Sequence, residues 1–218
     1  MLCSIFFCNV KPILLPIIFA LLIVSILAGI EWSKHAFHLN SEITRKIAHT
    51  LTAGISVFTP YYLPSVEIVI LSGGFALFLL FTRHRHTLSS IHQVSRRTQG
   101  AELLPVGIGL AALTLLPAHV LAFQFGVLVL AGADSLAYLI GTTYGHHPLP
   151  LPKISKTWEG VATFVIVTFF TVLLLGKSLT PAVGSGIMLL TLLELLSPRG
   201  LDNLFLAPGA GIIWLFIF

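Results

Sequence analysis

The chain has 218 residues, of which 56% are hydrophobic and only 9% are charged, and its mean hydropathy is +0.98. A soluble domain carries roughly 25% charged residues, so this composition excludes an ordinary soluble protein and indicates an integral membrane protein. The formal charge of +4 does not point to a nucleic-acid partner, because excess Lys and Arg in a membrane protein primarily determines its topology.

Apolar segments of spanning length follow one another along the whole chain. A bilayer-spanning helix needs about 20 mostly apolar residues, which predicts helices at residues 12–30, 47–63, 66–82, 103–118, 120–141, 159–176 and 179–197. A shorter apolar tail at 204–218 would be an eighth, tilted or partly inserted. We expect the first helix to be retained, because no credible signal-peptide cleavage site follows it. The sequence therefore predicts an all-α, polytopic membrane protein with seven or eight transmembrane helices, in which residues 1–218 form a single membrane-embedded domain.

The charged residues predict the orientation of the chain. With the N-terminus outside and each helix reversing direction, the inner side holds all Lys and Arg residues except Lys11 and Lys177. This bias agrees with the positive-inside rule, which places loops rich in Lys and Arg in the cytoplasm. The same assignment puts every acidic residue except Glu67 on or near the inner face. A catalytic surface that handles phosphates and a divalent cation needs both kinds of charge, so we predict an active site that faces the cytoplasm.

A first polar cluster opens the second predicted helix and consists of Glu42, Arg45, Lys46 and His49. Spacings of three and four residues place these side chains near one face of the helix. Two cations and a histidine at a helix start suit an anion, because backbone N–H groups and the helix dipole add to the attraction. A positive-inside anchor with an interfacial histidine explains the cluster equally well.

A second cluster lies in the longest inner loop, which runs from Arg83 to Pro105 and is basic. Its histidines indicate either a metal site or, as we favour, a solvated basic loop at the lipid headgroups. The candidates for a functional role lie at the entry to the next helix and are Arg97, Gly100 and Glu102.

A third cluster begins with Asp134, which lies deep in the fifth predicted helix. An ionised carboxylate inside the bilayer costs several kcal/mol unless it is paired, metal-bound or in a wet cavity. We therefore predict that Asp134 belongs to a functional site, with a protonated Asp in an interhelical hydrogen bond as the alternative. Gly141 and Gly145 follow on the same segment and permit the close approach of a ligand or a backbone.

The third cluster continues across the next loop. Lys153 and Lys156 supply point charges that suit phosphate, and Thr157 with Glu159 starts the next helix. This cluster is the most specific of the four, because a buried acid, two glycines and two lysines occur within one short stretch.

A fourth cluster consists of Glu194, near the inner end of the seventh predicted helix, and Asp202-Asn203 at the start of the next apolar segment. These groups offer the hard oxygen ligands that Mg²⁺ accepts beside phosphates, although a turn with polar caps would look the same. Together the four clusters combine carboxylates with Lys and Arg, as phosphoryl or nucleotidyl transfer requires.

From residue 42 to residue 203 the sequence resembles the polyprenol kinases, a family that includes dolichol, phytol and farnesol kinases and is related to CTP-dependent diacylglycerol kinase. The resemblance rests on the order and spacing of six motifs: Glu42-x-x-Arg45-Lys46-x-x-His49, Gly100-x-Glu102-x-x-Pro105, Asp134-x-x-Ala137-x-x-x-Gly141-x-x-x-Gly145, Lys156-Thr-x-Glu159-Gly160, Glu194 and Asp202-Asn203.

This resemblance implies transfer of the terminal phosphate of CTP, or of another nucleoside triphosphate, to the hydroxyl of a membrane lipid alcohol, with Mg²⁺ as cofactor. The residues it implies for nucleotide binding are Arg45, Lys46, Gly141, Gly145, Lys153, Lys156, Thr157 and Glu159. Those implied for catalysis are Asp134, Glu194, Asp202 and His49, and those implied for the metal are Asp134, Asp202 and Asn203. Glu42, Arg97 and Glu102 would support the site. The resemblance leaves open which acid holds the metal and which accepts the hydroxyl proton.

Two other interpretations compete with the kinase. A phosphatidate cytidylyltransferase of the CDP-diacylglycerol synthase type shares the motifs Asp134-Ser-Leu-Ala-Tyr138 and Lys156-Thr-Trp158-Glu-Gly160. That family ends with a Lys-Asp…His-Gly-Gly…Asp-Arg signature, which this chain lacks, so the kinase is favoured. A small transporter would place paired charges along a path through the bilayer, whereas here they gather on one side.

Overall fold

A computed structural model describes residues 2–85, 87–92, 99–150, 156–178, 180–197 and 200–218, with side chains from residue 14 onward. These residues form helices and contain no β-strand, only an isolated bridge between Pro148 and Thr157. The prediction of an all-α protein is confirmed. In chain order the elements are α1 (Leu2–Phe37), α2 (Ser41–Ser56), η1 (Thr59–Tyr61), α3 (Ser65–His84), α4 (Ser89–His92), α5 (Gly100–Leu115), α6 (Val120–Leu128), η2 (Val129–Asp134), α7 (Ser135–Thr143), α8 (Trp158–Leu174), α9 (Pro181–Leu196) and α10 (Asp202–Phe216).

Three segments are long and apolar enough to cross a bilayer: Leu14–Phe37 of α1, all of α3, and Val120–Thr143, which runs through α6, η2 and α7. Four shorter apolar helices, α5, α8, α9 and α10, accompany them. Large apolar side chains such as Ile70, Phe81 and Leu174 are more than half exposed on the outer faces of the helices. Water disfavours such surfaces and lipid accepts them, so the chain is an integral membrane protein.

The ends of two helices differ from the prediction. The helix predicted at 47–63 is α2, which already begins at Ser41 because the Asn40 side chain caps it and accepts a hydrogen bond from the Glu42 N–H (2.8 Å). It ends at Ser56, ahead of the turn that contains Pro60. The helix predicted at 12–30 is α1, which continues to Phe37 and stops where His38 adopts a positive φ of 51°. Caps and turns, which hydropathy does not register, set these ends.

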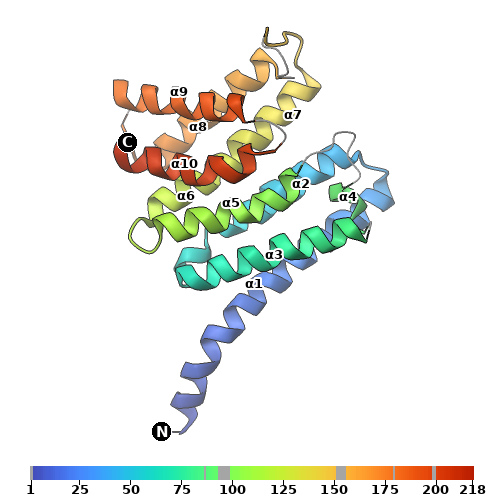
Figure 1. The fold of residues 1–218 in the computed structure, drawn as a ribbon, viewed down its shortest axis with the longest axis vertical. Coiled ribbons are helices and arrows are strands. Elements are labelled where there is room, and N and C mark those ends of the chain that lie inside the picture. The colour runs from blue at the N-terminus through green and yellow to red at the C-terminus, as the bar shows by residue number, and fades with distance from the viewer. Residues whose placement is uncertain (1, 86, 93–98, 151–155, 179, 198–199) are drawn as a thin grey trace.

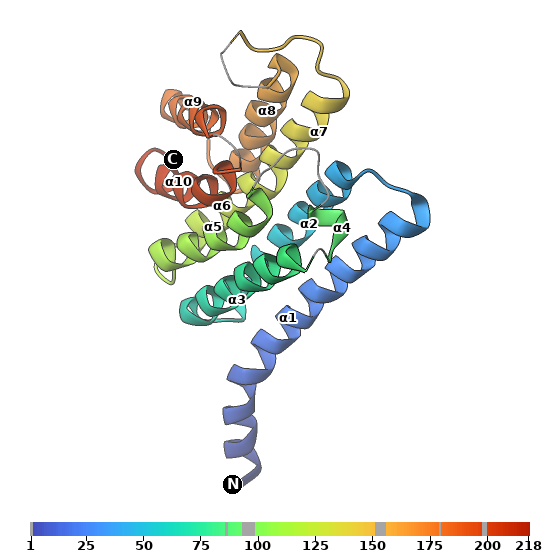
Figure 2. The same ribbon diagram turned by 45° about the vertical axis from the view of Figure 1, so that its right-hand side comes forward.

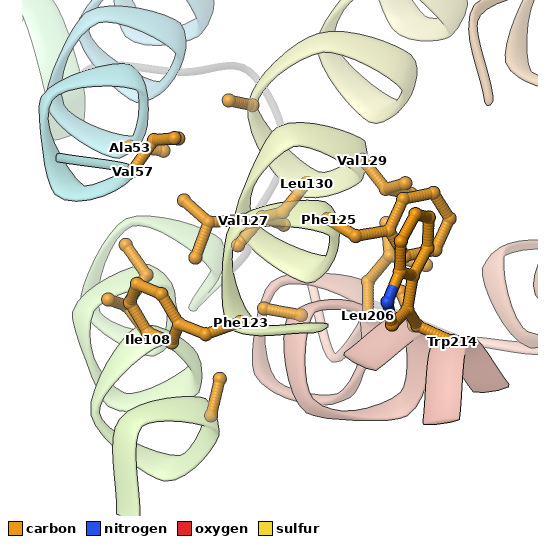
Figure 3. Packing of buried hydrophobic residues seen from close by; sticks show 14 of the residues in the cluster. Ala53, Val57, Ile108, Phe123, Phe125, Val127, Val129, Leu130, Leu206 and Trp214 are labelled. Carbon is orange, nitrogen blue, oxygen red and sulfur yellow. The ribbon is translucent and has the colours of Figure 1, made fainter. Parts of the chain in front are cut away.

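The central segment of the bundle is α6–η2–α7, which α2, α5, α8 and α10 surround (Figures 1 and 2). In Figure 3, Val127 points toward Val57, which directly follows α2, Phe123 toward Ile108 of α5, and Phe125 toward α10. By contrast α1 lies at the edge of the bundle, and its N-terminal end projects away from the other helices (Figure 1). The acid of the third cluster, which ends η2, is therefore held by the most completely packed segment.

The segment predicted as a tilted or partly inserted tail is α10, which packs into the core of the bundle. Leu206, Ala207 and Ala210 are fully buried, and the ring of Trp214 lies 4.9 Å from that of Phe125, centroid to centroid (Figure 3). Hydropathy reports how apolar this segment is but not that small residues let it pack closely, so its place in the core was not predicted.

The crossing of α5 and α10 depends on a glycine. A Cβ atom at Gly107 would lie 2.1 Å from the backbone oxygen of Asn203, so the two helices would have to separate. Replacing Gly107 with Ala is expected to lower the free energy of unfolding by about 1–3 kcal/mol, measured as a lower thermal midpoint in detergent. Gly73→Ala in α3, where no atom lies within 4 Å of the new Cβ, is the matched control. Equal midpoints for the two variants would contradict this account of the crossing.

Polar residues at the ends of several helices meet in one part of the bundle. Arg83 at the end of α3 pairs with Glu102 at the start of α5, and the Asn203 amide at the start of α10 donates to the Gly100 carbonyl oxygen. The Thr44 hydroxyl on α2 donates to the backbone oxygen of Ser90 (2.8 Å). The polar clusters that are far apart in the sequence are thus brought to a common region.

Candidate active site

A buried ion pair between α2 and η2 forms the centre of the site. Lys46 Nζ lies 2.6 Å from Asp134 Oδ2, and the two residues are only 7% and 3% exposed. Nε2 of His49, about one turn further along α2, lies 3.8 Å from the same oxygen and 3.1 Å from the Leu130 carbonyl oxygen. The cation explains how a carboxylate is tolerated within a spanning segment.

Asp134 occupies a special position in the backbone, because it ends η2, which is a π-helix. Turns of this kind occur often at functional sites and leave carbonyl groups outside the usual i→i+4 ladder. Here the carbonyl oxygens of Leu130 and Ala131 face α2, where His49 and Thr50 bind them at 3.1 Å. The sequence analysis missed this turn, since the stretch Val-Leu-Ala-Gly-Ala-Asp contains no motif for it.

Glu42 connects the first cluster to the third. Its Oε2 accepts hydrogen bonds from the Tyr138 hydroxyl (2.7 Å) and from Arg45 Nη2 (3.1 Å). The Tyr138 ring lies beside the central cation, with its centroid 4.9 Å from Lys46 Nζ. The sequence analysis did not select Tyr138 as a site residue, although its position four residues after Asp134 places both on one helix face.

A second ion pair joins the loop before α8 to the end of α9. Lys156 Nζ lies 2.6 Å from Glu194 Oε1 and also donates to the Glu194 carbonyl oxygen. The next residue, Thr157, caps α8, because its hydroxyl accepts from the Gly160 N–H (3.3 Å). A Cβ at Gly145 would lie 2.7 Å from Thr157 Oγ1. Gly145 therefore allows the end of α7 to approach this cap closely.

Glu159 holds the loop that precedes α8. It accepts hydrogen bonds from the backbone N–H groups of His146 (3.0 Å) and His147 (3.2 Å), and its Oε1 lies 2.7 Å from His147 Nδ1. Glu159 therefore holds the backbone at His146 and His147 against the start of α8. Lys153 and Arg97, also predicted site residues, lie outside the described residues.

Glu102 is engaged away from the central pair. Its Oε1 lies 2.9 Å from Arg83 Nη1 and 3.9 Å from His92 Nδ1, while His92 Nε2 lies 3.1 Å from the Thr82 hydroxyl. Burial lowers the pKa of His92, so this histidine is neutral at pH 7. For His92 the favoured interpretation of a solvated basic loop is wrong, because it packs into a network that joins α3, α4 and α5.

The acids of the third and fourth clusters share one electrostatic environment. Asp134, Glu194 and Asp202 lie within electrostatic range of one another and of Lys156, and Lys46 lies within range of both Asp134 and Asp202. These charged groups, distant in the sequence, therefore lie in one region.

The same region has donors suited to Mg²⁺. Asn203 Oδ1 is buried and has no hydrogen-bond partner among the described residues, and Asp202 is its neighbour. The described residues contain no group of three or more His, Cys, Asp or Glu side chains arranged for a metal. Mg²⁺ commonly uses only one or two carboxylates and takes its other ligands from phosphates and water, so this donor set fits a Mg²⁺ ion that arrives with a nucleotide.

An apolar cavity adjoins the central pair. It lies between α1, α2, α3 and α5 and is partly open to the surroundings. Its polar end is formed by Arg45, Lys46, His49, Gly100 and Asn203, and the remaining lining residues are mainly aliphatic and aromatic. The site thus combines charged groups with a space that suits hydrocarbon.

Comparison with known proteins agrees with these features. A family model described as "Cytidylyltransferase family" matches residues 1–201. The chain belongs to this family. It is also 31% identical over 188 residues to phytol kinase from Synechocystis sp. (strain ATCC 27184 / PCC 6803 / Kazusa), an alignment that covers 79% of the chain and 78% of that relative.

No solved structure matches the chain. Family membership and the phytol kinase relative confirm the resemblance to the polyprenol and phytol kinases. The protein is therefore a membrane enzyme of the lipid kinase and cytidylyltransferase type.

Proposed function

We propose that the protein is a kinase that transfers the terminal phosphate of CTP, or of another nucleoside triphosphate, to the hydroxyl of a lipid alcohol. The observation that carries the proposal is the cavity whose polar end includes Lys46 while its interior is apolar. A molecule with one hydroxyl head and a hydrocarbon tail matches this polarity, and its head would lie beside the Lys46–Asp134 pair. The phytol kinase relative, whose name denotes a lipid alcohol acceptor, supports the same reaction.

The charged residues would act mainly by position and electrostatics, as phosphoryl transfer requires. Lys46 and Lys156 are each held by a carboxylate at 2.6 Å, and both would turn to phosphate oxygens when the nucleotide binds. Arg45 lies one residue before Lys46 and would add charge at the polar end of the cavity. Mg²⁺ would neutralise the phosphate oxygens when bound, and Asp202 with Asn203 would hold it.

The reaction itself is a displacement at phosphorus. The lipid hydroxyl oxygen attacks the terminal phosphorus, the bond from that phosphorus to the bridging oxygen breaks, and the nucleoside diphosphate leaves with the electron pair. The hydroxyl proton passes to a carboxylate. We assign this role to Asp134, because Lys46 and His49, the two groups around its Oδ2, both line the cavity. In this scheme the chain spans the membrane seven or eight times as a single catalytic domain, with the site facing the cytoplasm.

Product analysis tests the proposal. Purified protein is incubated with Mg²⁺, with CTP labelled either in the terminal phosphate or in the cytosine, and with either a lipid alcohol such as phytol or phosphatidate. The kinase is expected to give a lipid monophosphate that carries the phosphate label, together with CDP. ATP labelled in the terminal phosphate is run in parallel to compare nucleotides. Cytosine label in a lipid product of phosphatidate, with release of pyrophosphate, would establish a cytidylyltransferase and overturn the kinase.

A further inference from the structure

The cavity beside the active site is long and follows one face of α2. The α2 residues that line it are Arg45, Ala48, His49, Thr52 and Ser56, together with Lys46 at the polar end. At 1.5 Å per residue, the stretch from Arg45 to Ser56 measures roughly 17 Å. On α3, which runs in the opposite direction, the lining extends over a similar length, from Leu79 to Ile68. The cavity therefore has a charged end and an end far from the charges.

Three of the four hydroxyl groups on the cavity wall, all but that of Ser72, donate hydrogen bonds within the chain and do not require a polar ligand. Thr52 donates to the Ala48 carbonyl oxygen (2.7 Å), Ser56 to that of Thr52 (3.0 Å), and Thr59 to that of Ser56 (2.7 Å). Since these donors are already satisfied within the chain, the wall presents mostly carbon atoms to the interior. At the far end, the lining residues Thr59 and Ile68 are each only 2% exposed, so they are tightly packed against their neighbours.

We infer that this cavity binds the single hydrocarbon tail of the alcohol substrate, and that Ser56, Thr59 and Ile68 at its far end set the longest tail the enzyme accepts. The inference rests on the proposed kinase function, because that function places the hydroxyl at the polar end. A tail that entered there would run along α2 toward η1, and one that exceeded the available length would meet the packed end. The α2 residues that line the cavity form one row along the helix, which suits one chain better than the two chains of a diacylglycerol.

The test is a chain-length profile for variants that fill the cavity at different depths. Geraniol, farnesol and geranylgeraniol, each longer than the one before by one isoprene unit, serve as acceptors. Ser56→Phe is expected to lower kcat/KM for geranylgeraniol by about tenfold or more and to leave geraniol unaffected. Thr52→Phe, nearer the hydroxyl, is expected to exclude farnesol as well. Leu51→Phe is the matched control, because Leu51 lies on the same helix and is 46% exposed outside the cavity.

A labelling experiment with the unmodified protein makes the result independent of variant folding. A geranylgeraniol analogue with a photoreactive group at the end of its tail is expected to label the segment from Ser56 to Ile68. Labelling only of residues outside the cavity would overturn the inference, and so would a Ser56→Phe profile equal to that of Leu51→Phe. Failure of the unmodified enzyme to phosphorylate every alcohol would instead contradict the proposed function, so the two failures are distinguishable.

Discussion

Replacing Asp134 with Asn is expected to reduce kcat by about 10²–10⁴-fold, the usual contribution of a positioned proton acceptor. Asn has nearly the same shape but cannot take the hydroxyl proton, and it leaves Lys46 without its negative partner 2.6 Å away. The measurement is transfer of labelled terminal phosphate to a lipid alcohol by purified protein at saturating substrates.

Stability must be separated from chemistry in this experiment. Removing one member of a buried ion pair typically costs about 3–5 kcal/mol, whereas replacing both members with apolar groups is often neutral. The double variant Lys46→Met/Asp134→Leu is therefore expected to melt close to the unmodified protein and still to be inactive. A double variant that is stable and active would remove Asp134 from the reaction.

Asp134 also shows which features of the candidate site could be predicted from the sequence and which could not. A single acid in the middle of an apolar segment is conspicuous, because the membrane makes an unpaired charge costly, so the sequence alone was enough to select it as a candidate site residue. Its partner was not, since Lys46 lies 88 positions away and spacing rules describe only neighbours on one helix. The π-helix that ends at Asp134 was equally inaccessible, because it depends on packing between α2 and η2.

For the helices, too, some features could be predicted from the sequence and others could not. Apolar length predicted where they lie, because the bilayer imposes a minimum on each spanning segment. Their ends and packing depended on particular groups, such as the Asn40 cap of α2 and the contact of Gly107 with Asn203. The cavity could not be predicted at all, since its wall is built from ordinary apolar residues of four helices and no pattern in one helix distinguishes it from a core face.

Replacing Lys156 with Met is expected to raise KM for the nucleotide by about 10–100-fold, with little change in KM for the lipid alcohol. A hydrogen bond to a charged group contributes about 1.5–3 kcal/mol, and each 1.4 kcal/mol corresponds to about tenfold in affinity. Lys156 is the better probe of the nucleotide because Lys46 lines the lipid cavity and Lys156 does not. Initial rates at varied nucleotide and at varied alcohol give the two constants.

The matched control is Lys177→Met. Lys177 also binds a backbone oxygen, that of Phe218 (2.6 Å), but it lies beside Trp214, in the last turns of α10, whose first residue is Asp202. Its loss is expected to leave both constants unchanged. If Lys156→Met instead weakened the alcohol and spared the nucleotide, the phosphate would have to lie elsewhere. The carboxylate of Glu194 would then hold Lys156 only to join α9 to the loop before α8, and the two buried ion pairs would have separate purposes.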